Sequence, residues 1–175
     1  MLERLSALSY RSRLLVLVVT TAAILVMVNI QIVNKQKILK NGDTLLLRLA
    51  PRDPRSLLQG DYMALRYAMT GEVAQAAKQA QLSDGRIIVE IKQDKQASFI
   101  GLYQGQALAQ GQRILRFRRR GESVRLASDA YFFEEGQWKT YSGARYGELR
   151  VDSGGDAVLI GLRDSKGRRL GPGLH

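Results

Sequence analysis

Residues 14–33 read LLVLVVTTAAILVMVNIQIV and contain no charged side chain. Asn29 and Gln31 are the strongly polar residues of this stretch, and both lie near its C-terminal end. A helix of this length measures about 30 Å, which is roughly the thickness of the hydrocarbon core of a bilayer. The sequence therefore predicts a transmembrane anchor at 14–33, preceded by an N-terminal flank at 1–13.

A cleaved secretory signal peptide is the alternative interpretation of the same residues. Signal peptides have an apolar core of about 7–15 residues, followed by a cleavage site of small residues. Here the apolar stretch is longer, Ala22 and Ala23 lie in its middle, and residues 31–37 contain no small-x-small pattern. We therefore expect the anchor to remain in the mature protein.

Positive charges flank the apolar stretch almost equally. Three arginines precede it, and Lys35, Lys37 and Lys40 follow it. The residues before it are few, whereas most of the chain follows it, and long soluble domains are translocated largely regardless of their charge. We therefore expect a bacterial inner-membrane protein with a cytoplasmic N-terminus and a periplasmic C-terminal domain.

The chain beyond residue 33 is basic. It contains 24 Lys and Arg against 15 Asp and Glu, a net formal charge of +9, and it has no Cys. This charge favours an anionic membrane surface or ligand, and nucleic acid is not expected as a partner of an exported domain. Without Cys, neither disulfides nor thiol chemistry is available.

After the anchor, the hydrophobic pattern changes from that of a helix to that of strands. Residues 34–40 continue the helix and Asn41-Gly42-Asp43 ends it, so a linker at 34–43 leads to a domain at 44–175. Short strands separated by turn residues, with one helix at 72–81, indicate a mainly β domain, either an antiparallel sandwich or a small barrel. The predicted strands are 44–49, 62–69, 86–92, 97–103, 112–118, 124–126, 129–134, 138–141, 146–151 and 157–162, with a hairpin loop at 152–156.

Residues 60–67 read GDYMALRY and match the signature of the GDYXXLXY family at every fixed position. Residues 51–54, PRDP, resemble the proline–Asp–Pro turn that precedes the octet in that family. The chain is thus similar to a family of bacterial membrane-anchored proteins. The resemblance implies a single N-terminal span, an exported domain and a multi-span membrane protein as partner, and it implies no reaction.

The octet has a structural and a binding interpretation. In the structural one, Gly60 and Asp61 form a turn, and strand alternation buries Leu65 and Tyr67. In the binding one, the turn and the oppositely directed Tyr62 contact a partner. The candidate binding residues of the octet and its approach are Asp53, Arg55, Gly60, Asp61, Tyr62, Leu65 and Tyr67.

A run of arginines in and just after the predicted strand 112–118 also has two interpretations. Arginines along an edge strand prevent association with other sheets. Alternatively, they form an anion-binding surface for a lipid headgroup, an envelope polymer or an acidic partner. The run comprises Arg113, Arg116, Arg118, Arg119 and Arg120.

Aromatic residues follow in the predicted strand 129–134. Alternation places Tyr131 and Phe133 together, which predicts that both lie in the core. Phe132 lies on the other face, where an exposed ring would form part of an interface.

The sequence contains no persuasive catalytic site. The Gly-Asp-Tyr turn weakly resembles a turn of signal-peptidase-like Ser/Lys proteases, for which Ser56 and Lys92 are the candidates. However, Ser56 is not followed by the expected Met/Tyr-Pro, and Lys92 is expected to face water rather than to be buried as such a base requires. Because His175 is the sole His and Cys is absent, the usual zinc sites are excluded.

We therefore expect a non-enzymatic, anchored accessory protein without metal or cofactor, whose β domain binds a multi-span membrane protein. The alternative is that the domain binds an anionic envelope ligand, such as a lipid headgroup or a glycan. A Ser/Lys hydrolase is the least favoured interpretation.

Overall fold

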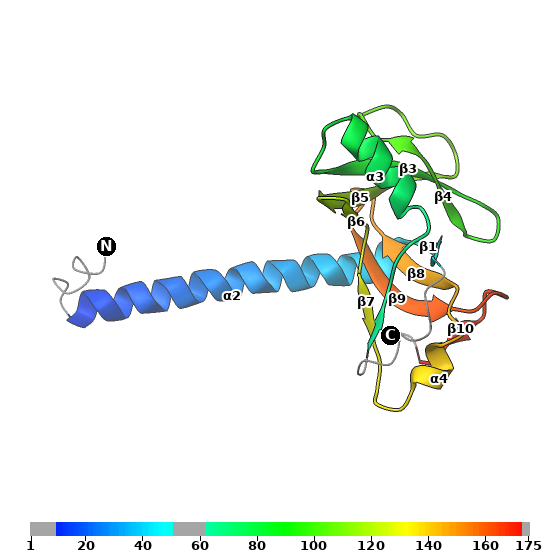
Figure 1. The fold of residues 1–175 in the computed structure, drawn as a ribbon. Coiled ribbons are helices and arrows are strands. Elements are labelled where there is room, and N and C mark those ends of the chain that lie inside the picture. The colour runs from blue at the N-terminus through cyan, green and yellow to red at the C-terminus, as the bar shows by residue number, and fades with distance from the viewer. Residues whose placement is uncertain (1–9, 51–61, 173–175) are drawn as a thin grey trace. The chain divides into compact units, whose positions relative to one another are not determined.

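A long apolar helix and a mainly β domain make up the protein (Figure 1). The structure is a computed structural model that describes residues 10–50 and 62–172. The chain divides into two compact units, with the boundary between Lys37 and Ile38. The β domain consists of curled antiparallel sheets, as half-barrels, with short helices. This confirms the predicted fold class.

Helix α2 (Tyr10–Asn41) contains the whole predicted anchor and the lysines that follow it. It ends where the sequence predicts, because the amide of Gly42 donates to the carbonyl of Ile38 at 2.9 Å. A Cβ at position 42 would lie 2.5 Å from that carbonyl oxygen. A glycine is therefore required at this point, where the chain passes from the helix into the first strand.

The first sheet has the strand order β1-β8-β9-β10, and all its pairs are antiparallel. Its first three strands were predicted from their alternating apolar residues, whereas the two-residue β10 was not. The strands are β1 (Asp43–Arg48), β8 (Tyr146–Val151), β9 (Ala157–Arg163) and β10 (Arg169–Leu170).

The second sheet has the order β4-β3-β5-β6 and is also antiparallel. Helix α3 (Thr70–Gln79) contacts its two outer strands, and α3 buries Val73 and Ala77 in the core. The sequence predicted these strands and this helix, with small differences at the ends. The strands are β3 (Asp84–Ile91), β4 (Ala97–Leu102), β5 (Gln112–Arg120) and β6 (Ser123–Arg125).

A two-stranded ribbon of β2 (Tyr62–Ala64) and β7 (Ala130–Phe132) carries the octet. The predicted strand 62–69 is therefore too long. After Ala64 the pairing continues as an isolated bridge between Tyr67 and Leu49, the residue that follows β1. Helix α3 then begins at Thr70. The predicted alternation nevertheless holds. Met63, Leu65, Tyr67 and Met69 are buried, whereas Tyr62 and Arg66 are exposed.

One hydrophobic core lies among the sheets and α3. Leu45 and Leu47 of β1 belong to it together with Ile87 and Val89 of β3, and all four side chains are fully buried. Because residues two apart in a strand point to the same face, period-two patterns in separate segments generate a shared interior.

The predicted strand 138–141 is wrong, because these residues form a one-turn helix, α4 (Trp138–Tyr141). Gly136, with φ +81°, forms part of the turn that precedes it. The helical turn buries Tyr141, whose ring stacks on Phe133 with 5.0 Å between centroids, and leaves Trp138 45% exposed. The expectation of one helix in the domain is therefore corrected to two, α3 and α4, among the residues that the structure describes.

Candidate functional site: an arginine pocket beside the octet strand

The structure describes only part of the octet and its approach. Asp53, Arg55, Gly60 and Asp61 lie outside the described residues, as does Ser56 of the proposed dyad. Tyr62, Leu65 and Tyr67 are described, and they fall into two groups. Leu65 and Tyr67 are buried, whereas Tyr62 is 41% exposed.

Tyr67 connects the octet to the core. Its ring is 3% exposed, and its hydroxyl donates a hydrogen bond to the carbonyl of Ser128 at 3.1 Å. Burial raises the pKa of Tyr67 well above its usual value; the nearby Asp129 adds to the rise, while the Ser128 bond opposes it. A Cβ on Gly147 of β8 would lie 3.1 Å from the ring, so the ring packs directly on that backbone. Tyr67 therefore has the structural role that its burial predicts.

Tyr62 forms an exposed aromatic pair with Phe132. The two residues are opposite each other in the β2–β7 ribbon, and their ring centroids lie 5.8 Å apart. Phe132 is 76% exposed, as the alternation around Tyr131 and Phe133 predicted, and Tyr131 is buried. We call Tyr62 and Phe132 the aromatic pair.

Strand β5 lies inside its sheet, so the edge interpretation of its arginines is wrong for Arg118, Arg119 and Arg120, which pair with β6. It pairs with β3 along most of its length and with β6 at its end. Before the residues that pair with β6, the amide of Arg116 donates to the carbonyl of Gly155 at 2.8 Å, so the tip of the β8–β9 loop covers part of the remaining edge. The sequence could not show this covering because the loop lies far along the chain.

Three arginines of the run take part in bonds within the fold. Arg113 pairs with Asp43 at 2.5 Å, and Arg116 pairs with Asp156 at 3.1 Å. Arg119 donates to the backbone carbonyls of Leu82 and Gly121, at 2.9 and 3.0 Å. These three residues are accounted for by the structure of the domain.

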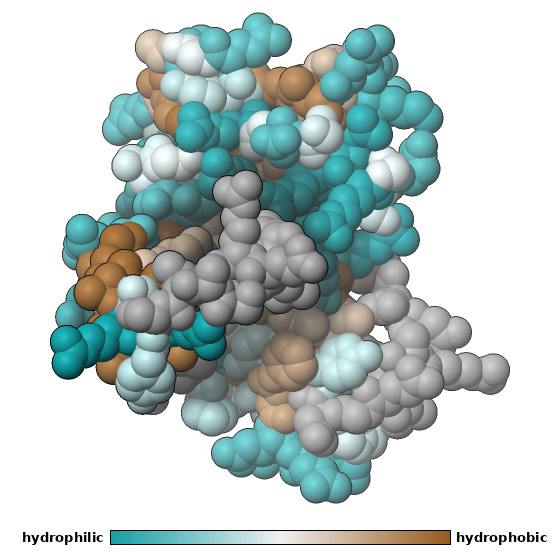
Figure 2. Space-filling model, turned by 90° about the vertical axis from the view of Figure 1, so that its left-hand side faces the viewer, coloured by the Kyte–Doolittle hydropathy of each residue, from teal (hydrophilic) through white to brown (hydrophobic). Residues whose placement is uncertain are grey.

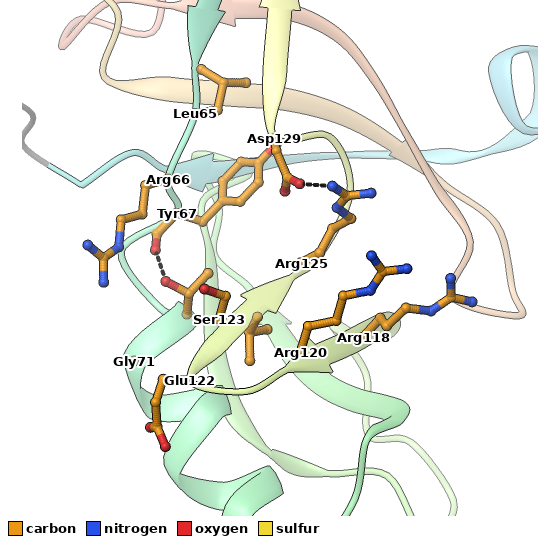
Figure 3. Close-up of a pocket in the computed structure, with 12 residues that line it drawn as sticks. Leu65, Arg66, Tyr67, Gly71, Arg118, Arg120, Glu122, Ser123, Arg125 and Asp129 are labelled. Atoms are coloured by element: carbon orange, nitrogen blue, oxygen red, sulfur yellow. Dashed lines mark hydrogen bonds and ion pairs between the residues drawn. The ribbon is translucent and has the colours of Figure 1, made fainter. Parts of the chain in front are cut away.

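Arg118 and Arg120 line a pocket of about 490 Å³ that also contains part of the octet (Figure 3). The guanidinium groups of Arg118, Arg120 and Arg125 lie on one side of it, and that of Arg66 lies on the other side of Tyr67. We call it the arginine pocket. Its lining residues are Leu65, Arg66, Tyr67, Thr70, Gly71, Arg118, Arg120, Glu122, Ser123, Val124, Arg125 and Asp129.

The arginine pocket unites two segments that the sequence analysis treated separately, the octet and the basic strand. Sequence reasoning missed Arg66 and Arg125, because each is a single arginine outside the run. Arg125 could have been found only from the pairing of β5 with β6, which sets it opposite Arg118. In the view of Figure 2, strongly hydrophilic residues make up much of the visible surface of the β domain.

The other sequence candidates do not form a catalytic group among the residues that the structure describes. Lys92 is exposed, as predicted. In residues 10–50 and 62–172, no cluster of three His, Cys, Asp or Glu could hold a metal ion. His175 lies outside the described residues.

The chain belongs to a family defined by the octet. The model of the GDYXXLXY protein family matches residues 24–162, which span from the middle of α2 to the end of β9. The chain is thus a GDYXXLXY protein, as its octet indicated. Searches among curated proteins and among solved structures returned no significant match.

Proposed function

We propose that this protein is a single-pass membrane anchor carrying a binding domain, which docks onto a multi-span membrane protein without catalysing a reaction. The observation that carries the proposal is the combination of an exposed apolar helix with an exposed aromatic pair, which Tyr62 of the octet strand forms with Phe132 of the neighbouring β7. The helix supports the membrane anchor, and the aromatic pair supports a protein partner.

Helix α2 has the properties of a transmembrane span. It is the one helix of sufficient length and apolarity among the described residues, and none of its most apolar window is buried within the protein. The side chains of Thr20 and Asn29 donate to the carbonyls of Val16 and Leu25, four residues earlier, at 2.7 and 2.8 Å. Polar groups satisfied within the helix lower the cost of placing it in lipid.

The proposed direction of insertion is supported by the length of the β domain, because long soluble domains are translocated largely regardless of their charge. In this proposal the β domain lies in the periplasm and the anchor lies in the bacterial inner membrane, with the residues before it on the cytoplasmic side. Lys35, Lys37 and Lys40 then lie near the outer headgroups, where long basic side chains extend toward the interface.

The aromatic pair supports a protein partner for the β domain. Tyr and Phe are enriched at protein interfaces, where their rings bury a large area for a small loss of side-chain entropy. Phe132 is exposed, so its ring contributes little hydrophobic stabilisation to the fold. The ring packs on Tyr62 at the surface of the domain. A partner held in the same membrane meets this surface at a high effective concentration.

Crosslinking in intact membranes tests the proposal. A photo-reactive residue at position 132 of the full chain should crosslink one multi-span membrane protein, which is recovered in stoichiometric amount after detergent extraction. Tyr62→Ala in the same chain should strongly reduce that product. Ile100→Ala is the matched control, because Ile100 is also apolar, 50% exposed and on another sheet. Recovery of no multi-span partner, or an equal loss with Ile100→Ala, would overturn the proposal.

A further inference from the structure

The acidic residues of the arginine pocket already have cationic partners. Asp129 forms an ion pair with Arg125, and Glu122 forms one with Lys78 at 3.2 Å. Arg66, Arg118 and Arg120 have no side-chain hydrogen bond or ion pair to any part of the chain that the structure describes. Within residues 10–50 and 62–172, three of the arginines that line the pocket therefore have no acidic partner.

The part of the fold that the structure describes gives these charges no structural role. Arg118 stands directly opposite Arg125 in the β5–β6 register, and like charges at opposite positions destabilise a sheet by a few tenths to about 1 kcal/mol. A neutral side chain at position 118 would therefore fit the fold as well or better. The contrast with Arg113 and Arg116 of the same strand, which both have acidic partners, sets Arg118 and Arg120 apart.

The start of helix α3 lies at the rim of the pocket, which Thr70 and Gly71 help to line. A Cβ on Gly71 would meet nothing within 4 Å, so the space beside this residue is open. The helix dipole favours negative charge at this end, where Glu72 is the acidic residue of the first turn.

We propose that the arginine pocket binds a phosphoryl group of a small ligand or of a lipid headgroup. The guanidinium fork matches phosphate oxygens in pairs, and several arginines around one concavity neutralise the two negative charges of a phosphoryl group. The pocket volume lies within the range of small-molecule sites. The site is separate from the aromatic pair, so this proposal does not depend on the protein partner.

Titration calorimetry on the full chain in a neutral detergent tests the site. The probes are inorganic pyrophosphate as the free phosphoryl compound and short-chain phosphatidic acid as the lipid headgroup. At least one should bind saturably with one site per chain, and the tighter of the two identifies the source. Arg118→Gln/Arg120→Gln should weaken that binding at least tenfold.

Arg113→Gln/Arg116→Gln is the matched control, because it removes two arginines from the same strand and changes the net charge equally. It should change the affinity by less than about twofold. Arg118→Lys/Arg120→Lys keeps the charge without the paired donors and should give an intermediate affinity. Far-UV circular dichroism checks that each variant folds. Equal weakening by both glutamine pairs, saturable binding of neither probe, or binding of an acidic peptide in preference to both probes would overturn the proposal.

Discussion

Glu148 and Arg163 form an ion pair between neighbouring strands β8 and β9, with 2.6 Å between Oε1 and Nη2. Arg169 of β10 donates to the other carboxylate oxygen, with 3.0 Å between Nε and Oε2. The Glu148 side chain is 4% exposed, so its charge lies inside the domain and is shared by two cations. This shared carboxylate connects the last three strands of the first sheet.

Glu148→Gln should destabilise the domain by about 2–4 kcal/mol, because it leaves two half-buried arginines without their anion. Urea unfolding of the full chain in neutral detergent, followed by circular dichroism, measures this loss. Asp156→Asn is the matched control, because it breaks the exposed ion pair with Arg116 and should cost less than about 1 kcal/mol. Similar losses of unfolding free energy in the two variants would show that burial of the Glu148 ion pair does not increase its contribution to stability.

The same carboxylate should make stability depend on pH. Burial acts to raise the pKa of Glu148, but the hydrogen bonds and charges of Arg163 and Arg169 outweigh it and hold the pKa below its ordinary value. A carboxyl with a lowered folded-state pKa stabilises the fold above its unfolded pKa, and this contribution disappears as the pH falls through the folded pKa.

The difference in unfolding free energy between the native chain and Glu148→Gln should therefore shrink between about pH 7 and about pH 3. Asp164 also has a lowered pKa, because hydrogen bonds from Arg168 and Lys166 outweigh its desolvation, but both proteins contain it and its effect cancels. A difference that stays constant over this pH range would show that Glu148 does not titrate as described.

Tyr67→Phe should cost about 1–2 kcal/mol, because it removes a buried hydroxyl and the hydrogen bond to the Ser128 carbonyl. Tyr62→Phe is the control within the same octet, because the Tyr62 ring is exposed and should tolerate loss of the hydroxyl to within about 0.5 kcal/mol. Thermal unfolding of the two variants distinguishes the buried tyrosine from the exposed one. Equal midpoints would mean that the octet tyrosines do not differ in role.

Local patterns predicted most of the fold, because burial in a strand leaves a period-two signal. Leu45, Leu47, Ile87 and Val89 gave that signal and lie in one core. The end of α2 was also predictable, because Asn41-Gly42-Asp43 is a local sequence that ends helices. The octet alone was also sufficient to predict the family, which the family match over residues 24–162 confirms.

Features that depend on distant contacts were not predictable. The neighbours of β5 are set by the β8–β9 loop and by the three-residue β6, so the sequence could not show that its arginines are not on an edge. Arg66 lines the arginine pocket because the fold brings the octet segment next to β5 and β6, which lie far along the chain. Helix α4 was mistaken for a strand because its aromatic residues favour strands, whereas packing of Tyr141 on Phe133 is satisfied by a single helical turn.

Gly155→Ala should be strongly destabilising, whereas Gly154→Ala should be mild. Gly155 has φ +89°, and a Cβ there would lie 2.8 Å from Ile114 Cγ2 and 3.1 Å from the Arg116 amide nitrogen. The backbone strain alone is worth about 1–2 kcal/mol, and the contacts add to it. A Cβ on Gly154 would come no closer than 3.4 Å, to the Asp152 side chain. Urea unfolding of the two variants should differ by more than about 1 kcal/mol; equal values would mean that the loop tip is not fixed on β5.

The apolar helix should keep the mature protein in the membrane. Intact-mass measurement of protein extracted from membranes should give a chain that still contains residues 14–33, and alkaline washing should not release it. Leu25→Arg places a charge near the centre of the apolar stretch and should reduce membrane retention, since a central arginine costs about 2.5–3.5 kcal/mol. Lys37→Arg is the control, because it keeps the charge at the helix end. A soluble protein whose first residue lies beyond Val33 would show that the helix is a cleaved signal, and a tethered binding domain could not then be its function.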